Sequence, residues 1–508
     1  MSFQARLVKP AYVRPTGSKK PRAVQTVIGL HRPTGVTMRN RITTDNNEEQ
    51  GRRLYRAIWR WHFYAGVFCI PFVLWLSVTG SIYLFRPQIE RWLDRPYDHL
   101  HLAGTRATPE QIALAAVAAV PHSSLHYYEL PPNADAAARV VVGVGKEEFR
   151  VYIHPVTRQT LYIINEDHRP MTLLAHLHGQ LLAGKWGSYL VELAASWAIV
   201  LLLTGLYLWW PRQTEKLAGV LWVRLGKGER TFWRDIHAVT GVWISALALF
   251  LILTGLPWAN NWGAYFKSIR RMTGTAAKHQ DWATGLASEL AARSAMNSSS
   301  LNAMSDMPDM PGMEHAENLE RMMHHPSPDA YSAFNRLVPL AGSLGLAYPV
   351  KIVPAMAPGG MWTIKSDAQN RTLRDVVQAD PRTGAVVGRV NFNQTLLLDR
   401  IVLTGVATHE GQLFGLPNQL LGLLTALGLI TLSGSAVVLW WRRRHAGVLG
   451  APIPLETPRW SFVLIAAVLA LGLYLPEMGI SVVAVFLAER LLLSRIPSTQ
   501  RWLGLKQA

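Results

Sequence analysis

Cysteine is almost absent from this chain: among 508 residues only Cys69 occurs, inside a long apolar run. A single cysteine excludes a disulfide framework, thiolate clusters and a covalent haem attached through a CxxCH motif. The basic, hydrophilic segments also lack the glycine-rich fingerprint with a downstream acid that binds dinucleotides. Any nicotinamide or flavin chemistry must therefore belong to a separate protein.

Acidic residues are also few, because 33 Asp and Glu stand against 51 Lys and Arg, a net charge of +18. The excess lies in four segments that hold 27 Lys and Arg against 7 acidic residues: 1–61, 211–234, 442–459 and 489–508. Basic segments that alternate with apolar runs follow the positive-inside rule, which places them in the cytoplasm. Tryptophans lie beside the same segments, as expected of an interfacial belt: Trp59, Trp61, Trp209, Trp210, Trp233, Trp440 and Trp441. The charge therefore indicates topology, and nucleic acid is excluded as a partner.

Four apolar runs are long enough to cross a hydrocarbon core of about 30 Å. They lie at about 62–85, 188–210, 236–258 and 416–441, and two shorter runs flank Pro476. We predict an integral membrane protein, mainly an α-helical bundle, with four core spans and a C-terminal helical hairpin. The chain is predicted to begin with a disordered basic cytoplasmic tail (1–50). The predicted spans are 55–86, 187–211, 232–258 and 409–442, the last including its pre-helix. A cytoplasmic loop is predicted at 212–231 and the hairpin at 459–494. External α+β domains fill 87–186 and 259–408.

An internal duplication is indicated by matching segments in the two halves. HFYAGVFCIPFVLWLSVTG (62–80) and HAVTGVWISALALFLILTG (237–255) both place Thr-Gly at the end, with Thr 17 residues after His. HGQLLAG (178–184) and HEGQLFG (409–415) each precede a span that ends in Trp-Trp. The external segments share a strand, tight turn and strand at 149–164 and 373–390, and TPEQ begins a predicted helix over 108–120.

Four histidines occupy equivalent places in this repeat. His62 and His237 begin spans from the cytoplasmic side, whereas His178 and His409 precede spans on the outer side. A single histidine at a span boundary is usually interfacial, but the repetition favours two ligand pairs, one at each face. Haem needs one or two protein ligands whereas structural zinc needs about four, so two histidines per site favour b-type haem. Gly66 and Gly241, one turn after their histidines, would leave room for a flat macrocycle.

Other residues are weaker candidates. His176 has no counterpart in the second half and is a reserve ligand. Glu192 and Asp235 are candidates to orient a ligand or relay protons, with an interfacial carboxylate as the alternative. Arg56, Arg60, Arg212 and Arg234 are candidate partners of haem propionates. The pairs Thr79-Gly80, Thr204-Gly205, Thr254-Gly255 and Ser433-Gly434 are interpreted first as helix-packing contacts.

One stretch, 296–325, belongs to one half only and holds seven of the 14 methionines. Thioether and imidazole ligands suit copper, especially Cu(I), and a polar linker is the alternative. The candidate copper ligands are Met304, Met307, Met310, Met313, His315, Met322, Met323, His324 and His325.

Four segments, in order over about 55–445, resemble the PepSY-associated transmembrane family. They are HFYAG…TG, LHGQLLAGKWG…LLLTGLYLWWPR, DIHAVTGVW…LTG and THEGQLFG…WWRRR. Its members include inner-membrane ferric-siderophore reductases. The resemblance implies periplasmic PepSY-like domains, two b haems with axial ligands His62, His178, His237 and His409, and electron transfer across the bacterial inner membrane. A separate donor would supply the electrons, and a ferric siderophore or other metal chelate would be reduced to release Fe(II).

Three rival functions remain at this stage. The insertion favours a cupric reductase or copper-handling protein, and PepSY-like domains also occur in regulators and peptidase inhibitors. A transporter with repeated halves is a third rival, although the spans lack a buried Asp/Lys pair or a midplane break.

The haem hypothesis further requires a break after each outer histidine, at Gly184 or Gly187 and at Gly411, Gly415 or Pro417. A straight helix from His178 to Trp209 would extend about 46 Å, which is longer than the hydrocarbon core.

Overall fold

The computed structural model describes residues 35–211, 217–275, 331–355, 359–455 and 460–505. Residues up to Arg52 form one unit and residues from Arg53 onward form another, and the fold below is that of the second unit. The Met/His-rich insertion, with all nine candidate copper ligands, and Arg212 lie outside the described residues.

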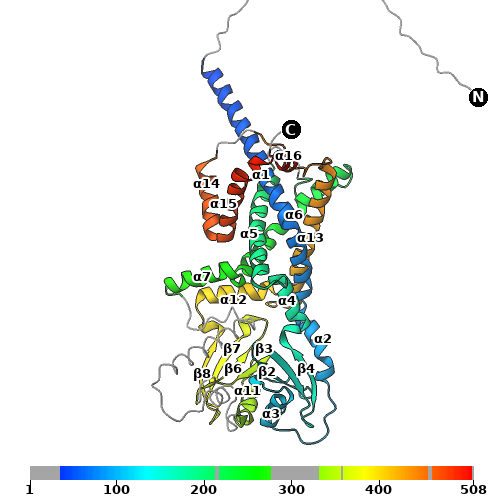
Figure 1. Ribbon diagram of the computed structural model, residues 1–508, viewed down its shortest axis with the longest axis vertical. Coiled ribbons are helices and arrows are strands. Elements are labelled where there is room, and N and C mark those ends of the chain that lie inside the picture. Colours follow the sequence, from blue (N-terminus) through cyan, green and yellow to red (C-terminus); the bar gives the residue numbers. More distant parts are fainter. Residues whose placement is uncertain (1–34, 212–216, 276–330, 356–358, 456–459, 506–508) are drawn as a thin grey trace, which may run out of the picture. The chain divides into compact units, whose positions relative to one another are not determined.

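Four helices of the described chain are long and apolar enough to cross a membrane, as predicted. They are α1 (Gly35–Tyr83), α5 (Gly184–Trp209), α6 (Glu229–Gly255) and α13 (Leu416–Arg443). α6 packs against both α5 and α13, and Figure 1 shows the four running alongside one another. Trp209-Trp210 lies at the end of α5 and Trp440-Trp441 lies near the end of α13. α6 begins at this same end of the bundle. We call this the basic end, and the opposite end, near the strands, the sheet-side end.

The first helix differs from the prediction at its beginning. Residues 35–50 were expected to belong to a disordered tail, but α1 already starts at Gly35. Glu48 and Glu49 each precede an arginine by four residues, Arg52 and Arg53, and this spacing supports a polar helix. The charge pattern that indicated a tail therefore also suits an extension of the first helix.

The C-terminal hairpin consists of α14 (Phe462–Tyr474) and α15 (Pro476–Leu491), and the chain direction bends by 120° between them. Pro476 ends the first helix because a proline cannot continue the helical hydrogen-bond ladder. At 1.5 Å per residue the two arms extend about 20 and 24 Å, short of a hydrocarbon core of about 30 Å. The hairpin docks on the bundle through Leu475 and Met478, which pack against Ile199 and Trp262. It continues through the 3-10 turn η6 (Leu493–Arg495) into α16 (Pro497–Leu503).

The eight strands form one antiparallel sheet with the order β4-β3-β2-β1-β5-β6-β7-β8. The first half of the chain contributes β1 (Ser124–Glu129), β2 (Ala138–Val144), β3 (Glu147–Ile153) and β4 (Thr160–Asn165). The second half contributes β5 (Val350–Val353), β6 (Trp362–Ser366), β7 (Asp375–Ala379) and β8 (Val386–Asn391). Both predicted strand-turn-strand units are present, as β3–β4 and β7–β8.

The two external segments were predicted as separate domains, but their strands join at a single seam. β1 pairs with β5 through Tyr128 opposite Ile352 and Glu129 opposite Lys351. One face of the joined sheet is covered by α3 (Pro109–Ala119) and α11 (Phe334–Ser343), whose apolar residues share one buried cluster with the strands. The predicted helix start is confirmed, because Thr108 and Gln111 form a reciprocal cap at the beginning of α3. In two separate four-stranded domains, β1 and β5 would each be an edge strand with unpaired backbone groups. The pairing of β1 with β5 satisfies both edges.

The other face of the sheet buries charged side chains beside apolar and aromatic ones such as Val141 and Tyr152. Arg150 donates to Glu129 at 2.8 Å and also bonds Glu166, and all three side chains are buried. Arg139 pairs with Asp98 of α2 (Arg86–Asp98), the helix that follows the first span. Buried charges require such partners because their desolvation is costly. This face is therefore held against α2 by ion pairs.

Two helices run crosswise between the bundle and the sheet in Figure 1: α7 (Asn260–Met272), which follows the 3-10 turn η2 (Leu256–Trp258), and α12 (Leu397–His409). They are joined by the buried pair of Arg270 and Asp399, with Nη2 at 3.0 Å from Oδ2. On the sheet-side end of α5 lies a further short helix, α4 (Pro170–Gln180), which follows the 3-10 turn η1 (Glu166–His168) and carries His178.

Both predicted breaks are present. α4 ends at Gln180 and α5 begins at Gly184, and Leu181, Leu182 and Gly184 adopt left-handed conformations between them. In the second half, Gly411 and Gly415 are left-handed between the end of α12 and the start of α13, where Pro417 lies in the first turn. Gly187 is not part of the break but lies inside α5, where a Cβ would collide with the carbonyl oxygen of Gln180 at 1.7 Å. The histidine-bearing segments thus fold back instead of extending the spans.

Candidate functional site

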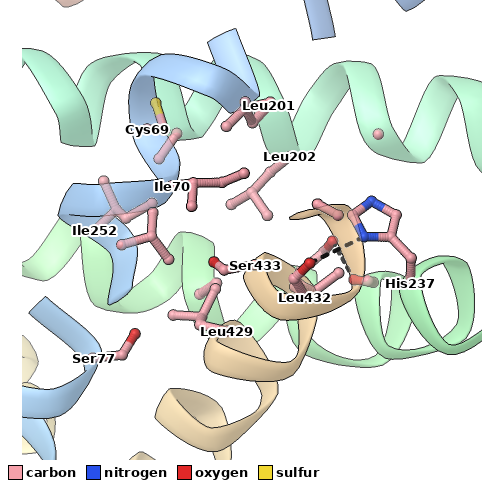
Figure 2. A pocket seen from close by; sticks show the side chains of 18 of the residues that line it. Cys69, Ile70, Ser77, Leu201, Leu202, His237, Ile252, Leu429, Leu432 and Ser433 are labelled. Carbon is pink, nitrogen blue, oxygen red and sulfur yellow. Dashed lines mark hydrogen bonds between the residues drawn. The ribbon is translucent and has the colours of Figure 1, made fainter. Parts of the chain in front are cut away.

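One cavity of about 1750 Å³ runs inside the helical bundle and is lined by all four repeat histidines: His62, His178, His237 and His409. Small-molecule sites usually measure about 300–1,000 Å³, so this cavity has room for more than one ligand of that size. Its wall between the histidine pairs is largely apolar, with Cys69, Ile70, Ile252 and Leu429 in Figure 2. Gly66 and Gly241 also line it.

At the basic end, His62 of α1 lies beside His237 of α6. Their ring centres are 6.4 Å apart and their planes are nearly perpendicular, at 82°. Nδ1 of His62 lies 3.0 Å from the Thr204 hydroxyl of α5. Nδ1 of His237 lies 3.2 Å from both the Leu432 carbonyl oxygen and the Ser435 hydroxyl of α13, and Figure 2 shows His237 beside Leu432. Four helices therefore fix this pair.

At the sheet-side end, the second pair is held in the same way. Nδ1 of His178 lies 2.9 Å from the Thr79 hydroxyl of α1. Nδ1 of His409 lies 3.1 Å from the Thr254 hydroxyl and 2.9 Å from the Leu251 carbonyl oxygen of α6. Burial, and then the nearby His409, lower the pKa of His178 to about 4, and burial lowers the pKa of His409. Both rings are neutral at pH 7, as metal-binding imidazoles must be.

The tautomer of each histidine follows from its partners. The hydroxyls of Thr79, Thr204 and Thr254 donate their single proton to the carbonyl four residues earlier, at 2.7–2.8 Å. A hydroxyl that has used its proton can only accept, so Nδ1 of His178, His62 and His409 carries the hydrogen. For His237 the Leu432 carbonyl accepts, with the same result. All four Nε2 atoms therefore keep their lone pair, which is the electron pair that a metal ion requires.

The glycine of each Thr-Gly pair makes space for the ring that the threonine binds. A Cβ at Gly80 would lie 3.1 Å from Cε1 of His178, and one at Gly205 would lie 3.2 Å from Cε1 of His62. A Cβ at Gly255 would lie 3.3 Å from Cε1 of His409. These pairs were interpreted first as helix-packing contacts, and the three Thr-Gly pairs also orient histidines. The equal spacing from His to Thr in α1 and α6 was the signal that pointed to this role.

The two histidine pairs lie at different levels of the bundle. On α1, His62 belongs to the first pair and Thr79 holds the second, 17 residues later. On α6, His237 and Thr254 repeat this arrangement with the same spacing. At 1.5 Å per residue the levels are about 25 Å apart along the helices, most of a hydrocarbon core of about 30 Å.

The described residues fit a metal between two imidazoles better than a structural zinc site. They contain no group of three or more His, Cys, Asp and Glu side chains placed to hold a metal ion, whereas structural zinc takes four ligands. A metal–nitrogen bond of about 2 Å on each side, with about 1 Å from nitrogen to ring centre, places two imidazole centres about 6 Å apart. The 6.4 Å between His62 and His237 agrees with this value.

The weaker candidates have other contacts. His176 does not line the cavity, although it lies two residues before His178. Glu192 lines it but accepts hydrogen bonds from the backbone of Asn261 and Trp262, at 3.0 and 2.8 Å, at the start of α7. Asp235 is fully buried and accepts hydrogen bonds from the guanidinium groups of Arg224 and Arg234, not from His237.

Arginines gather where the cavity meets the basic end. Of the four predicted for propionates, only Arg234 lines the cavity among the described residues. Arg60 instead donates to the carbonyls of Pro452 and Gly504, and Arg56 lies over the Trp59 ring. The lining arginines that the sequence did not single out are Arg224, Arg230, Arg442 and Arg443.

A family model described as PepSY-associated TM region matches residues 59–443. This range includes all four histidines and the residues that hydrogen-bond their rings. The chain belongs to this family. Comparison with the curated proteins finds no match. Membership of the PepSY-associated family agrees with the four candidate spans.

Proposed function

We propose that the protein is a haem-dependent membrane oxidoreductase that passes electrons across the bacterial inner membrane to an external metal chelate. A ferric siderophore, reduced to release Fe(II), is the favoured substrate. The observation that carries the proposal is the set of four histidines, which pair across one cavity with every Nδ1 protonated and every Nε2 free to bind a metal. An interfacial histidine needs neither a partner histidine nor a fixed tautomer.

His62 and His237 would hold one haem, and His178 and His409 a second. Bound haem supplies a one-electron carrier at each level of the membrane. The chain's own residues keep the imidazoles neutral, fix their rings through hydroxyl and carbonyl groups, and exclude water with an apolar wall. Such surroundings and axial ligands are the means by which a protein sets a haem potential.

The proposed orientation in the membrane follows from the charges. The positive-inside rule puts the basic end in the cytoplasm, where a separate donor would lose one electron for each ferric ion reduced. The joined sheet would then lie in the periplasm, next to the His178–His409 pair. The chelate would approach the outer haem at the sheet-side end of the bundle, where α7, α12 and the sheet lie.

An optical spectrum of the purified full chain, oxidised and then reduced with dithionite, tests the proposal. Two haems per chain are expected, with the Soret band and split α/β bands of low-spin haem, and the reduced protein should be reoxidised by a ferric hydroxamate chelate. A correctly folded but colourless protein would refute the haem proposal and favour a regulatory role. Reoxidation by a Cu(II) chelate but not by ferric chelates would favour the cupric alternative.

Removing one orienting hydroxyl should weaken the site that it serves. Thr204→Val keeps the side-chain shape and deletes the acceptor of His62 Nδ1–H. Loss of such an outer-shell partner typically lowers metal affinity about 10–100-fold, so partial loss of the basic-end haem is expected. Haem content and the midpoint potentials of both sites measure this effect.

Thr431→Val is the matched control, because Thr431 bonds only its own helix, through the Leu427 carbonyl, in the described structure. Equal haem loss in both variants would mean that helix stability, and not the histidine contact, is responsible.

A further inference from the structure

The charges that line the cavity are separated along its length. Among the described lining residues the only carboxylates are Glu192 and Glu410, and the only Lys or Arg side chains are arginines near the basic end. Glu410 follows His409 of the sheet-side pair directly, and Glu192 accepts hydrogen bonds from the start of α7. The arginines, beside the other histidine pair, are Arg224, Arg230, Arg234, Arg442 and Arg443.

Three of these arginines already have a carboxylate partner. Asp235 accepts hydrogen bonds from Nε of Arg224 at 2.7 Å and from Nη2 of Arg234 at 2.8 Å. Glu229 accepts one from Arg442 at 2.6 Å. Because Asp235 carries a single charge and is shared by two guanidinium groups, these contacts leave an excess of positive charge at the basic end.

Arg443 has no carboxylate partner in the described chain, and its guanidinium lies close to the basic-end histidines. Its Cζ is 5.2 Å from the ring centre of Trp59 and 5.3 Å from that of Phe63, which follows His62 directly. Both rings line the cavity. The guanidinium donates to the Gly450 carbonyl at 3.0 Å, which leaves most of its five donors available.

Arg230 lies in the first turn of α6 and also lines the cavity. It has no hydrogen bond or ion pair from its side chain within the residues that the structure describes. It precedes His237 by seven residues, which is about 10 Å along the helix toward the basic end. Arg230 and Arg443 are thus two cavity-lining cations without a carboxylate partner, on the same side of the His62–His237 pair.

We propose that Arg230 and Arg443 bind the carboxylates of the group that His62 and His237 hold, which for haem are its two propionates. This inference rests on the proposed function, because it names the anionic contacts of the basic-end haem. A carboxylate turned toward the apolar middle of the cavity would lose water without gaining a partner. One turned toward the basic end gains charge-assisted hydrogen bonds.

Arg444, the next residue after Arg443, is the matched control. Its Cζ lies 4.2 Å from the ring centre of Trp441, and it does not line the cavity. Arg444→Gln removes the same charge from the same end of α13 and leaves the contact with Phe63 in place. A general effect of basic charge at the membrane surface would therefore appear in this variant as well.

The test compares haem with its dimethyl ester, which lacks both carboxylates. Full-length chain with His178→Ala, which leaves only the basic-end pair intact, is prepared without haem and titrated with either compound. Adding Arg230→Gln and Arg443→Gln together should weaken haem binding about tenfold, because two charge-assisted contacts that water can reach are lost. Affinity for the diester should be nearly unchanged, and Arg230→Lys with Arg443→Lys should restore part of the loss. Arg444→Gln should change neither affinity.

The sheet-side site provides an internal comparison. In a chain with His237→Ala, which keeps only the sheet-side pair, the same two glutamine substitutions should leave haem affinity unchanged, because no arginine lines the cavity there in the described structure. If the histidine variants fail to fold, apomyoglobin is used to withdraw haem from the loaded chain that carries only the two glutamine substitutions. One of its two haems should then leave about tenfold faster than from the unsubstituted chain, and neither diester should.

Equal losses for haem and diester, no loss for either, or an equal loss at the sheet-side site would overturn the inference, since a merely structural role does not distinguish the two compounds. Unchanged withdrawal by apomyoglobin would do the same. Absence of haem binding by the unsubstituted chain would instead overturn the proposed function, and the inference with it.

Discussion

Alanine at His62 and alanine at His237 are expected to remove the same one of two haems, and the double variant should lose no more than either single variant. The ring centres lie 6.4 Å apart, so under the proposed function each ring is half of one bis-imidazole site. Alanine at His178 or His409 should remove the other haem. Haem-to-protein ratio and the two midpoint potentials report which site is lost.

The combination of variants across the two pairs provides the decisive comparison. Chain with both His62→Ala and His178→Ala should contain no haem, because each substitution damages a different site. His176→Ala is the control, since His176 lies on the same short helix as His178 but does not line the cavity. If His62→Ala and His178→Ala instead remove the same haem, the assignment of pairs is wrong.

Leucine at Gly80 should displace the His178 ring and abolish the sheet-side haem, whereas leucine at Gly205 should abolish the other. A bare Cβ at these positions would already lie 3.1 and 3.2 Å from the imidazole carbons, closer than most real contacts, and leucine adds three further carbons. Overpacking of this kind usually costs about 1–3 kcal/mol, and the ring is the neighbour that must move. Haem content, resolved by potential, measures the result.

Gly434→Leu is the control for this experiment. Gly434 also belongs to a hydroxyl-glycine pair in a span, but a Cβ there would meet no atom within 4 Å. It should keep both haems and the expression level of the unsubstituted chain. Loss of haem in the Gly434 variant as well would show that leucine disturbs these helices in general, and the selective loss claimed for Gly80 would be refuted.

Much of the architecture could be predicted from residue patterns alone. Apolar runs predict the spans because a span needs about 20 apolar residues, and the helix start at Thr108 follows from its capping signature. Length and turn residues also predicted the breaks after Gln180 and His409. In each case the signal is local, so a single segment contains the information.

The sequence could not predict features that depend on distant segments. The seam between β1 and β5 joins strands more than 200 residues apart, and nothing within either strand marks it as a shared edge. The left-handed Leu181 and Leu182 were missed because leucine is a good helix former, and tertiary contacts override that preference here.

The hydrogen bonds of the four imidazoles have a kinetic consequence. Each ring is already clamped by a hydroxyl or carbonyl group of another helix, in the orientation that leaves its second nitrogen available. If each pair holds a haem, as proposed, ligands held this rigidly would move little when the oxidation state of the metal changes, and little nuclear reorganisation would oppose an electron transfer. The rate of such a relay would then depend mainly on the gap between the two levels.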